Sequence, residues 1–279
     1  MLLMSCALAD VEIHDLRSGE KIDRETLLQR TPAKGTIVFG EEHYSLAIQK
    51  AEGDLIKWIV EHHRTEGRHS ATWEFLDYPD QKRVDLALEQ WKSGESTSDD
   101  FLLDLFKNEN TASKHRVYLP FLESLKLFDG TLIAGNAPRE WKRIITQQGL
   151  SALNPELIPE HCMRPGDNYW ERFAIAMQDH VSLEELKRYY EAQYFTDCVL
   201  GKVMSSVSKE EQKFLIVGSF HSDYNEGVIP RLKLYGEEKV VSIKLIDASR
   251  LSSEHIETLL KPHPKYGRIA DFIYLIRNL

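Results

Sequence analysis

Short runs of β-branched and aromatic residues alternate along the chain with longer segments in which apolar residues recur every three or four positions. The runs that predict buried strands cover residues 36–39, 71–75, 131–134, 214–217 and 240–246. Residues 11–16 alternate like a half-buried strand, and residues 272–277 predict a final edge strand. Strands that alternate with helices are typical of a parallel sheet. The pattern therefore predicts an α/β fold, with a largely parallel central sheet flanked by helices.

Two helical stretches are too long to be ordinary crossovers between strands. Residues 78–128 predict three helices in succession, and residues 166–208 are largely helical, with Ser182 and Glu185 forming a capping box. We expect these insertions to form a helical lid subdomain. The expected division is residues 11–77, 129–160 and 209–279 for the α/β core, residues 78–128 and 161–208 for the lid, and residues 1–10 for the remnant of an export signal or a disordered start.

The chain has 279 residues and a net charge of −9. This charge and the lack of a basic stripe argue against nucleic-acid binding. No run of apolar residues approaches the roughly 18 that a membrane-spanning helix needs. Of the three cysteines, Cys162 and Cys198 have two interpretations: two buried thiols, or a disulfide if the protein is exported.

The first ten residues also have two interpretations. Residues 7–9 read Ala-Leu-Ala, which fits a signal-peptide cleavage site, and residues 3–6 end in Cys6 and resemble a lipoprotein box. The first interpretation is a truncated export signal, and it predicts a periplasmic protein or one tethered to a membrane through a lipidated Cys6. The second is an ordinary cytoplasmic N-terminus.

Two motifs of the form Gly-x-x-His carry the strongest functional signal. One ends in His43 and the other in His221, and each follows a predicted buried strand. A third strand carries Glu74 between two aromatic residues, where a buried carboxylate is costly unless it is paired or ligated. In an open α/β sheet, ligands bind outside the carboxyl ends of the strands, so these three side chains are expected to share one pocket. They could hold a metal ion, contact haem or bind a polar substrate.

Three more residues are candidates for the same pocket. Tyr224 follows His221, and a tyrosine phenolate can be an axial ligand of ferric haem. Arg139 follows the 131–134 strand and could pair with a carboxylate. Gln193 and Asp197 lie four apart on a predicted helix and could reach the pocket from the lid. The alternative for each is an ordinary surface residue.

Common catalytic motifs are missing from the sequence. There is no Gly-x-Ser-x-Gly elbow, no glycine-rich phosphate loop, no dinucleotide-binding fingerprint and no His-Glu-x-x-His zinc motif.

The order of several short motifs resembles the ChaN-like haem-binding proteins of bacterial iron uptake. The resemblance runs from about residue 11 to residue 235. Its motifs are Gly40-Glu41-x-His43 with Gln49, the strand that carries Glu74, the Ala-Gly-Asn-Ala-Pro-Arg segment at 134–139, Gln193 with Asp197, Gly218-Ser219-Phe220-His221, and Pro230-Arg231. The resemblance implies an exported protein that binds haem, with haem at a homodimer interface. The wider superfamily includes Tiki-type metalloproteases and erythromycin esterases, whose members also use paired Gly-x-x-His motifs and a glutamate.

Two functions follow from this resemblance. The first is haem binding, with His43, His221, Tyr224, Arg139 and Gln193 as contacts. The second is a metal-dependent hydrolase, in which His43, Glu74 and His221 hold a divalent ion that activates water. This chain departs from the family's pattern after His43, where further histidines are common and Tyr44-Ser45-Leu46 stands instead. The departure leaves the iron ligand open.

Overall fold

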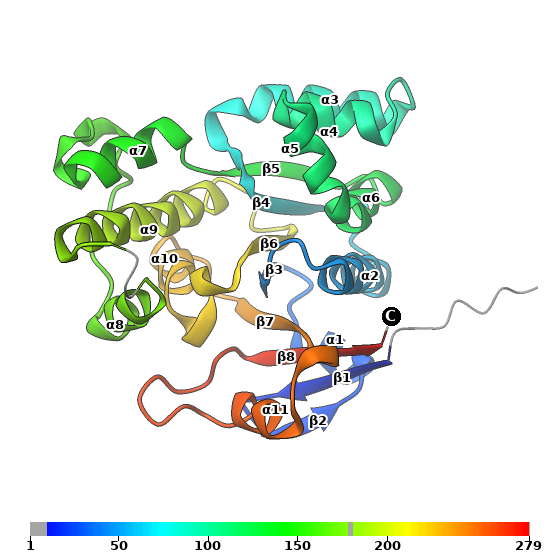
Figure 1. Ribbon diagram of the computed structural model, residues 1–279. Coiled ribbons are helices and arrows are strands. Elements are labelled where there is room, and N and C mark those ends of the chain that lie inside the picture. The colour runs from blue at the N-terminus through cyan, green and yellow to red at the C-terminus, as the bar shows by residue number, and fades with distance from the viewer. Residues whose placement is uncertain (1–9, 178–180, 279) are drawn as a thin grey trace, which may run out of the picture.

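The computed structural model describes residues 10–177 and 181–278, and an eight-stranded sheet forms its centre (Figure 1). The strands lie in the order β2-β1-β8-β7-β3-β6-β4-β5. Their bounds are β1 Asp10–Asp15, β2 Glu20–Ile22, β3 Gly35–Glu41, β4 His69–Asp77, β5 Thr131–Asn136, β6 Gln212–Gly218, β7 Val240–Asp247 and β8 Phe272–Asn278. The six strands from β8 to β5 run parallel, which confirms the predicted α/β class.

The last strand is not an edge strand, so that expectation from the sequence is wrong. β8 lies between β7, with which it is parallel, and β1, with which it is antiparallel. Its residues alternate between the two faces: Ile273 and Leu275 pack on one side, and Phe272, Tyr274 and Ile276 on the other. A strand that is apolar on both faces is stable when other elements pack on both faces and other strands pair with both of its edges. β7 pairs with one edge of β8, and β1 pairs with the other.

Eleven α-helices accompany the sheet within the described residues. They are α1 Arg24–Arg30, α2 Leu46–His63, α3 Gln81–Ser93, α4 Ser98–Phe106, α5 Glu109–His115, α6 Leu119–Leu127, α7 Arg139–Gln148, α8 Asp167–Ala176, α9 Leu183–Met204, α10 Val228–Leu234 and α11 Ser253–Leu259. The predicted Ser182–Glu185 capping box starts α9. Asp23 is the N-cap of α1, and Pro138 is the N-cap of α7.

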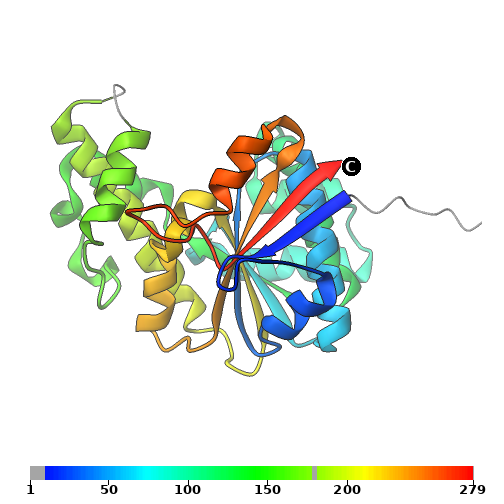
Figure 2. The same cartoon turned by 90° about the horizontal axis from the view of Figure 1, so that it is seen from below.

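The helices form layers on both faces of the sheet (Figure 2). Phe39, Trp73 and Phe214 pack against α2, α3, α4 and α6 on one face. Val38, Leu215 and Val217, which alternate with them, pack against α9 and α10 on the other. The helices of residues 78–128 thus share a hydrophobic core with α2, and those of residues 161–208 belong to the opposite layer. The boundaries drawn between core and lid stay a prediction.

Cys162 and Cys198 form a disulfide with a Cα–Cα distance of 5.4 Å. Of the two interpretations of these cysteines, the structure therefore has the disulfide rather than two buried thiols. Cys6 and the export-signal residues lie outside the described residues. Within the part of the chain that is described, none of the helices has both the length and the apolar character that crossing a membrane requires.

Candidate functional site

Glu74 lies between the two histidines of the Gly-x-x-His motifs. Its Oε1 is 2.8 Å from His43 Nε2, and its Oε2 is 3.8 Å from His221 Nε2. The backbone N–H of Gly218 donates a hydrogen bond of 2.9 Å to Oε2. The structure therefore brings His43, Glu74 and His221 together at one end of the sheet, as expected from the sequence.

Sheet order explains why these side chains meet. His43 follows β3, Glu74 lies in β4, and His221 follows β6, which pairs with both of those strands. Gly218 allows the close approach, because a Cβ atom there would lie 2.7 Å from His43 Nε2. Successive side chains of a strand point to opposite faces, so Glu74 points away from the face on which Trp73 packs in the core.

Two further carboxylates complete the cluster at its outer ends. Glu41 Oε1 lies 3.0 Å from His43 Nδ1, and Asp197 Oδ1 lies 2.7 Å from His221 Nδ1. Both carboxylates are almost fully buried. We call the five residues Glu41, His43, Glu74, Asp197 and His221 the strand-end centre.

Side chains that the sequence did not reveal hold the outer carboxylates. The Tyr118 hydroxyl donates to Glu41 Oε1 at 2.8 Å, and the Tyr169 hydroxyl donates to Asp197 Oδ2 at 2.7 Å. Gln49 donates to Glu41 Oε2 at 2.7 Å. Gln49 matches the family pattern at sequence level, whereas the two tyrosines come from distant helical segments and carry no local signal.

Charges alternate along the strand-end centre. Burial alone lowers the pKa of His43, but hydrogen bonds from its ring to Glu41 and Glu74 outweigh burial and raise it to about 10. Burial likewise opposes the charge of His221, yet Asp197 and then Glu74 raise its pKa. Burial by itself raises the pKa of Glu74. The hydrogen bond from His43 and the nearby ring of His221 outweigh burial, so the pKa is lowered overall. His43 is thus a cation between two carboxylates at neutral pH, and the carboxylates beside His221 favour the protonated form of its ring as well.

This pairing bears on the predicted metal set of His43, Glu74 and His221. Both nitrogens of His43 face carboxylates, and so does Nδ1 of His221, whereas a metal-ligating nitrogen must be unprotonated. Within residues 10–177 and 181–278, no group of three or more His, Cys, Asp or Glu side chains is arranged to hold a metal ion.

The other predicted residues lie at different distances from the centre. Gln193 reaches it, because its side-chain nitrogen is 3.2 Å from both ring nitrogens of His221. Arg139 is exposed at the start of α7, and none of its described contacts joins it to the histidines. Tyr224 lines a separate cavity of about 320 Å³, with Lys261 and His263 among its neighbours. The structure therefore groups Gln193 with the histidines and separates Tyr224 and Arg139 from them.

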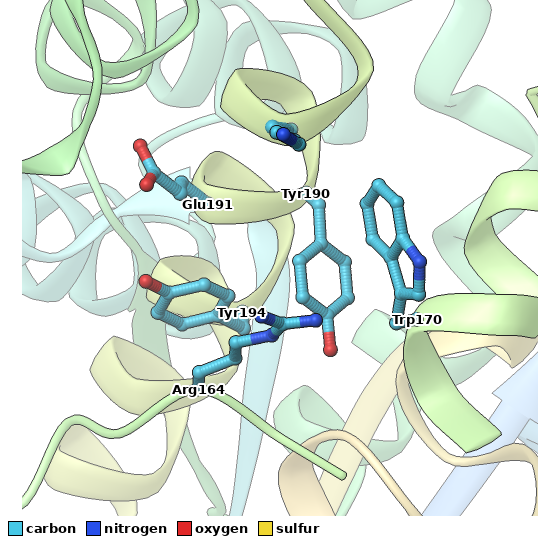
Figure 3. Close-up of a pocket in the computed structure, with 6 residues that line it drawn as sticks. Arg164, Trp170, Tyr190, Glu191 and Tyr194 are labelled. Atoms are coloured by element: carbon cyan, nitrogen blue, oxygen red, sulfur yellow. The ribbon is translucent and has the colours of Figure 1, made fainter. Parts of the chain in front are cut away.

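A second hollow lies between α8 and α9, and sequence reasoning missed it (Figure 3). This α8–α9 pocket has a volume of about 230 Å³ and is lined by Arg164, Trp170, Lys187, Tyr190, Glu191 and Tyr194. The Tyr190 hydroxyl is buried and has no hydrogen-bond partner among the described residues. The lining residues run from Arg164 to Tyr194 and come from three separate segments of the chain, so no single sequence motif indicates the pocket.

Aromatic contacts join the α8–α9 pocket to the strand-end centre. The rings of Tyr190 and Tyr169 have centroids 5.9 Å apart, and the Tyr169 hydroxyl binds Asp197. Asp197 in turn binds His221. The two sites are therefore neighbours separated by one tyrosine.

Comparison with solved structures identifies similar folds. The ChaN structure from Campylobacter jejuni, titled for cofacial haem binding, is 14% identical over 96% of this chain and 97% of that one, with a TM-score of 0.74. The type III effector HopBA1 is 13% identical over 92% of this chain and 94% of its own, with a TM-score of 0.47. No curated protein sequence matches the chain significantly.

The sequence itself gives the family. The profile described as "Haem-binding uptake, Tiki superfamily, ChaN" matches residues 27–232, which is most of the chain and includes the whole strand-end centre and the α8–α9 pocket. The chain therefore belongs to the ChaN family of haem-binding uptake proteins in the Tiki superfamily.

Proposed function

We propose that this protein binds haem in bacterial iron uptake and that the α8–α9 pocket is where it does so. The observation that carries the proposal is the buried Tyr190 hydroxyl, which lacks a partner in the described structure and lies in a pocket rich in aromatic side chains. A buried hydroxyl without a hydrogen bond costs roughly 1–3 kcal/mol, and a ligand that bonds to it removes that cost.

The lining of the pocket suits haem chemically. Trp170 and Tyr194 offer flat apolar surfaces beside Tyr190, while Arg164 and Lys187 can pair with the two propionates. Burial raises the pKa of Tyr190 to about 12, and the positive charge of a ferric ion at its oxygen would favour the phenolate. Tyr190 is therefore the proposed iron ligand.

The size of the pocket supports a second copy of the chain as partner. Its volume of about 230 Å³ is below the roughly 300–1,000 Å³ that encloses a drug-sized ligand, so one chain would cover only part of a haem. Four large apolar residues are exposed on and beside the α8–α9 hairpin: Met163, Ile175, Leu183 and Tyr189. We propose that two hairpins close over haem in a homodimer. Sedimentation velocity with and without hemin tests this, and a monomer at saturating hemin would contradict it.

Titration with hemin tests the proposed ligand. Tyr190→Phe removes only the hydroxyl, so we expect the Soret shift of the bound state to be lost or moved and the affinity to fall at least tenfold. Tyr78→Phe is the matched control, because Tyr78 lies in the Tyr78–Asp80 turn, outside both the α8–α9 pocket and the exposed residues of the hairpin. Equal spectra and affinities for wild type and Tyr190→Phe would rule out Tyr190 as the ligand.

The placement of haem near the strand ends, with His43, His221, Gln193, Arg139 and Tyr224 as contacts, is a competing proposal. The same titration separates the two. A spectrum that changes in His221→Gln or Tyr224→Phe, but not in Tyr190→Phe, would favour the strand-end placement.

A hydrolase that uses the strand-end centre remains the second candidate. One observation favours it: the 3.8 Å gap between Glu74 Oε2 and His221 Nε2 is the one long link in the centre, and a water there could contact both groups. A divalent ion held by His43, Glu74 and His221 would need the imidazoles to give up their protons first. Metal analysis of the protein as purified tests the metal-dependent hydrolase. One bound ion per chain that is lost in Glu74→Gln would support it.

We propose that the protein works outside the cytoplasm. The Cys162–Cys198 disulfide supports this, since structural disulfides persist mainly in oxidising compartments. Cell fractionation of the native host with an antibody against the chain tests the proposal, including tethering through a lipidated Cys6. Recovery only with reduced cytosolic proteins would contradict it.

A further inference from the structure

The segment that carries Arg164 has little structure of its own. Residues 158–166 join a 3₁₀ turn, Pro155–Leu157, to α8 without a regular helix or strand. Two side chains of the α10 region hold its backbone: Arg231 donates to the carbonyl of Met163, and the Tyr235 hydroxyl donates to the carbonyl of Glu160. The disulfide between Cys162 and Cys198 is the covalent attachment.

That disulfide joins the two walls of the α8–α9 pocket. Cys198 lies on α9, four residues after Tyr194 and eight after Tyr190, so all three lie along the same side of the helix. Cys162 lies two residues before Arg164, whose guanidinium carbon is 5.8 Å from the ring centroids of both Trp170 and Tyr190. The bond therefore attaches the segment that carries Arg164 to the helix that carries Tyr190 and Tyr194.

Arg164 itself is weakly held. Its side chain is exposed and, within the described residues, makes no ion pair, so its position depends on its backbone and on the two aromatic rings. Glu191, the acidic residue of the pocket, is engaged instead by the backbone N–H of Leu150 at 2.7 Å. The guanidinium of Arg164 is thus available to pair with an anionic ligand, provided that the backbone at Arg164 keeps its position.

We propose that the Cys162–Cys198 disulfide is a positioning element of the α8–α9 pocket, which places Arg164 to bind a carboxylate of the ligand, and that reduction of the disulfide weakens ligand binding. This inference rests on the proposed function, because it takes haem as the ligand. Reduction by a dithiol transfers two electrons and two protons to the pair, breaks the S–S bond, leaves two cysteine thiols and converts the dithiol to its own disulfide. After reduction, the 158–166 segment keeps the Arg231 and Tyr235 hydrogen bonds but loses its covalent attachment to α9, so the guanidinium is less firmly fixed beside Tyr190.

Hemin binding to four forms of the full chain tests the proposal: wild type, Cys162→Ser/Cys198→Ser, Arg164→Gln, and the triple variant. Serine avoids free thiols, which could themselves ligate iron. Loss of a hydrogen bond to a charged group weakens binding by roughly tenfold or more, so we expect this loss in both the double-cysteine and the Arg164→Gln forms. Because both changes act on one contact, the triple variant should bind no more weakly than Arg164→Gln.

Three results would overturn the inference. Equal affinity of wild type and the double-cysteine form would show that the disulfide does not position the pocket. Equal affinity of wild type and Arg164→Gln would exclude Arg164 as a contact of the ligand. This comparison keeps the disulfide intact, so it does not depend on whether a cysteine variant folds. Fully additive losses in the triple variant would show that the disulfide acts by another route. Failure of oxidised wild type to bind hemin is a different result, because it contradicts the proposed function itself.

Circular dichroism and the tryptophan emission of each form establish that it is folded before titration. If the double-cysteine form does not fold, oxidised wild type is reduced with dithiothreitol, alkylated with iodoacetamide, freed of reagent and titrated in its place. Unchanged affinity after this treatment would overturn the inference in the same way.

Discussion

Glu74 shows how one buried acid can organise a site. It is only 7% exposed, yet it keeps its charge because His43, His221 and the N–H of Gly218 surround it. Each histidine has a second carboxylate on its far side, which favours the protonated form of its ring. The result is a row of opposite charges in which each member depends on its neighbours.

Replacing Glu74 with Gln should therefore destabilise the protein. The change leaves the cationic ring of His43 facing a neutral amide, and we expect a loss of roughly 2–3 kcal/mol in the free energy of unfolding, below that of a fully buried pair because His43 is partly exposed. Urea unfolding at pH 7 measures it. Glu66→Gln, at an exposed position, is the matched control and should change little. Equal losses for the two variants would mean that the ion pairs contribute no net stability.

The raised pKa of His43 predicts how its contribution depends on pH. Its pKa in the folded protein is about 10, above the roughly 6.5 of an unfolded chain, so folding favours the protonated ring. The stabilisation is fully present below pH 6.5 and is lost as the pH rises through 10. We expect the stability difference between wild type and His43→Gln to be greatest near pH 6 and to shrink towards pH 10.

Urea unfolding at several pH values measures this difference, and the exposed His255 provides the control as His255→Gln. A difference between wild type and His43→Gln that stays constant from pH 6 to pH 10 would contradict a shared proton between His43 and its carboxylates.

Sequence reasoning at this scale found residues with a local signature and missed those without one. His43 and His221 follow buried strands in matching motifs, so their meeting with Glu74 could be predicted. Tyr190 lies among ordinary helical aromatics, and its lack of a partner depends on how α8 and α9 pack. Tyr224 is close to His221 in sequence, but a left-handed backbone at Tyr224, with φ of 64°, helps to carry it into another cavity.

At the scale of elements, the packing of α2 on α6 depends on a glycine. A Cβ atom at Gly53 would lie 2.4 Å from the carbonyl carbon of Pro120, at the contact between the two helices. Gly53→Ala raises the helix propensity of α2 by up to about 1 kcal/mol but forces the helices apart. We expect the steric clash to outweigh the gain in helix propensity, with a net loss of about 1–2 kcal/mol in the free energy of unfolding.

Thermal unfolding measures the effect. Gly166→Ala is a suitable control, because no atom lies within 4 Å of a Cβ atom at that position and its φ of −63° suits alanine. A higher melting temperature for Gly53→Ala would show that the helices can separate at little cost.

Most element positions could be predicted because their signals are local: apolar runs for the strands, and the capping box at Ser182 for the start of α9. The place of β8 could not, because partners of a strand are chosen across the whole chain. A run such as Phe-Ile-Tyr-Leu-Ile is apolar on both faces and fits an inner strand, but only the pairing with β1 shows that its outer edge is covered.

For the whole molecule, the Cys162–Cys198 bond should contribute substantially to stability. It closes a loop with a sequence separation of 36, for which chain entropy predicts roughly 3–4 kcal/mol. We expect Cys162→Ser/Cys198→Ser to lower the unfolding free energy by that order, measured by urea denaturation without reductant. Addition of dithiothreitol should affect wild type and leave the variant unchanged. Equal stability of the two proteins would indicate that the unfolded chain is already compact in this region.

The fold class followed from alternating strands and helices, whereas the layers did not. β3 and β6 send alternate side chains to opposite faces of the sheet, and each of the two helical insertions packs on a different face. Which face a helix covers depends on the hand of each crossover and on sheet order, and neither is written in a local pattern.

The pairing of β1 with β8 joins the two ends of the described chain, with Ile13 opposite Tyr274. A ribosome adds about 5–20 residues per second, so roughly 10–50 s pass between synthesis of these two partners. During that time the hairpin of β1 and β2 has no neighbour, and the growing sheet ends at an open β7. Such unpaired edges invite wrong association until β8 leaves the ribosome and pairs with both β1 and β7.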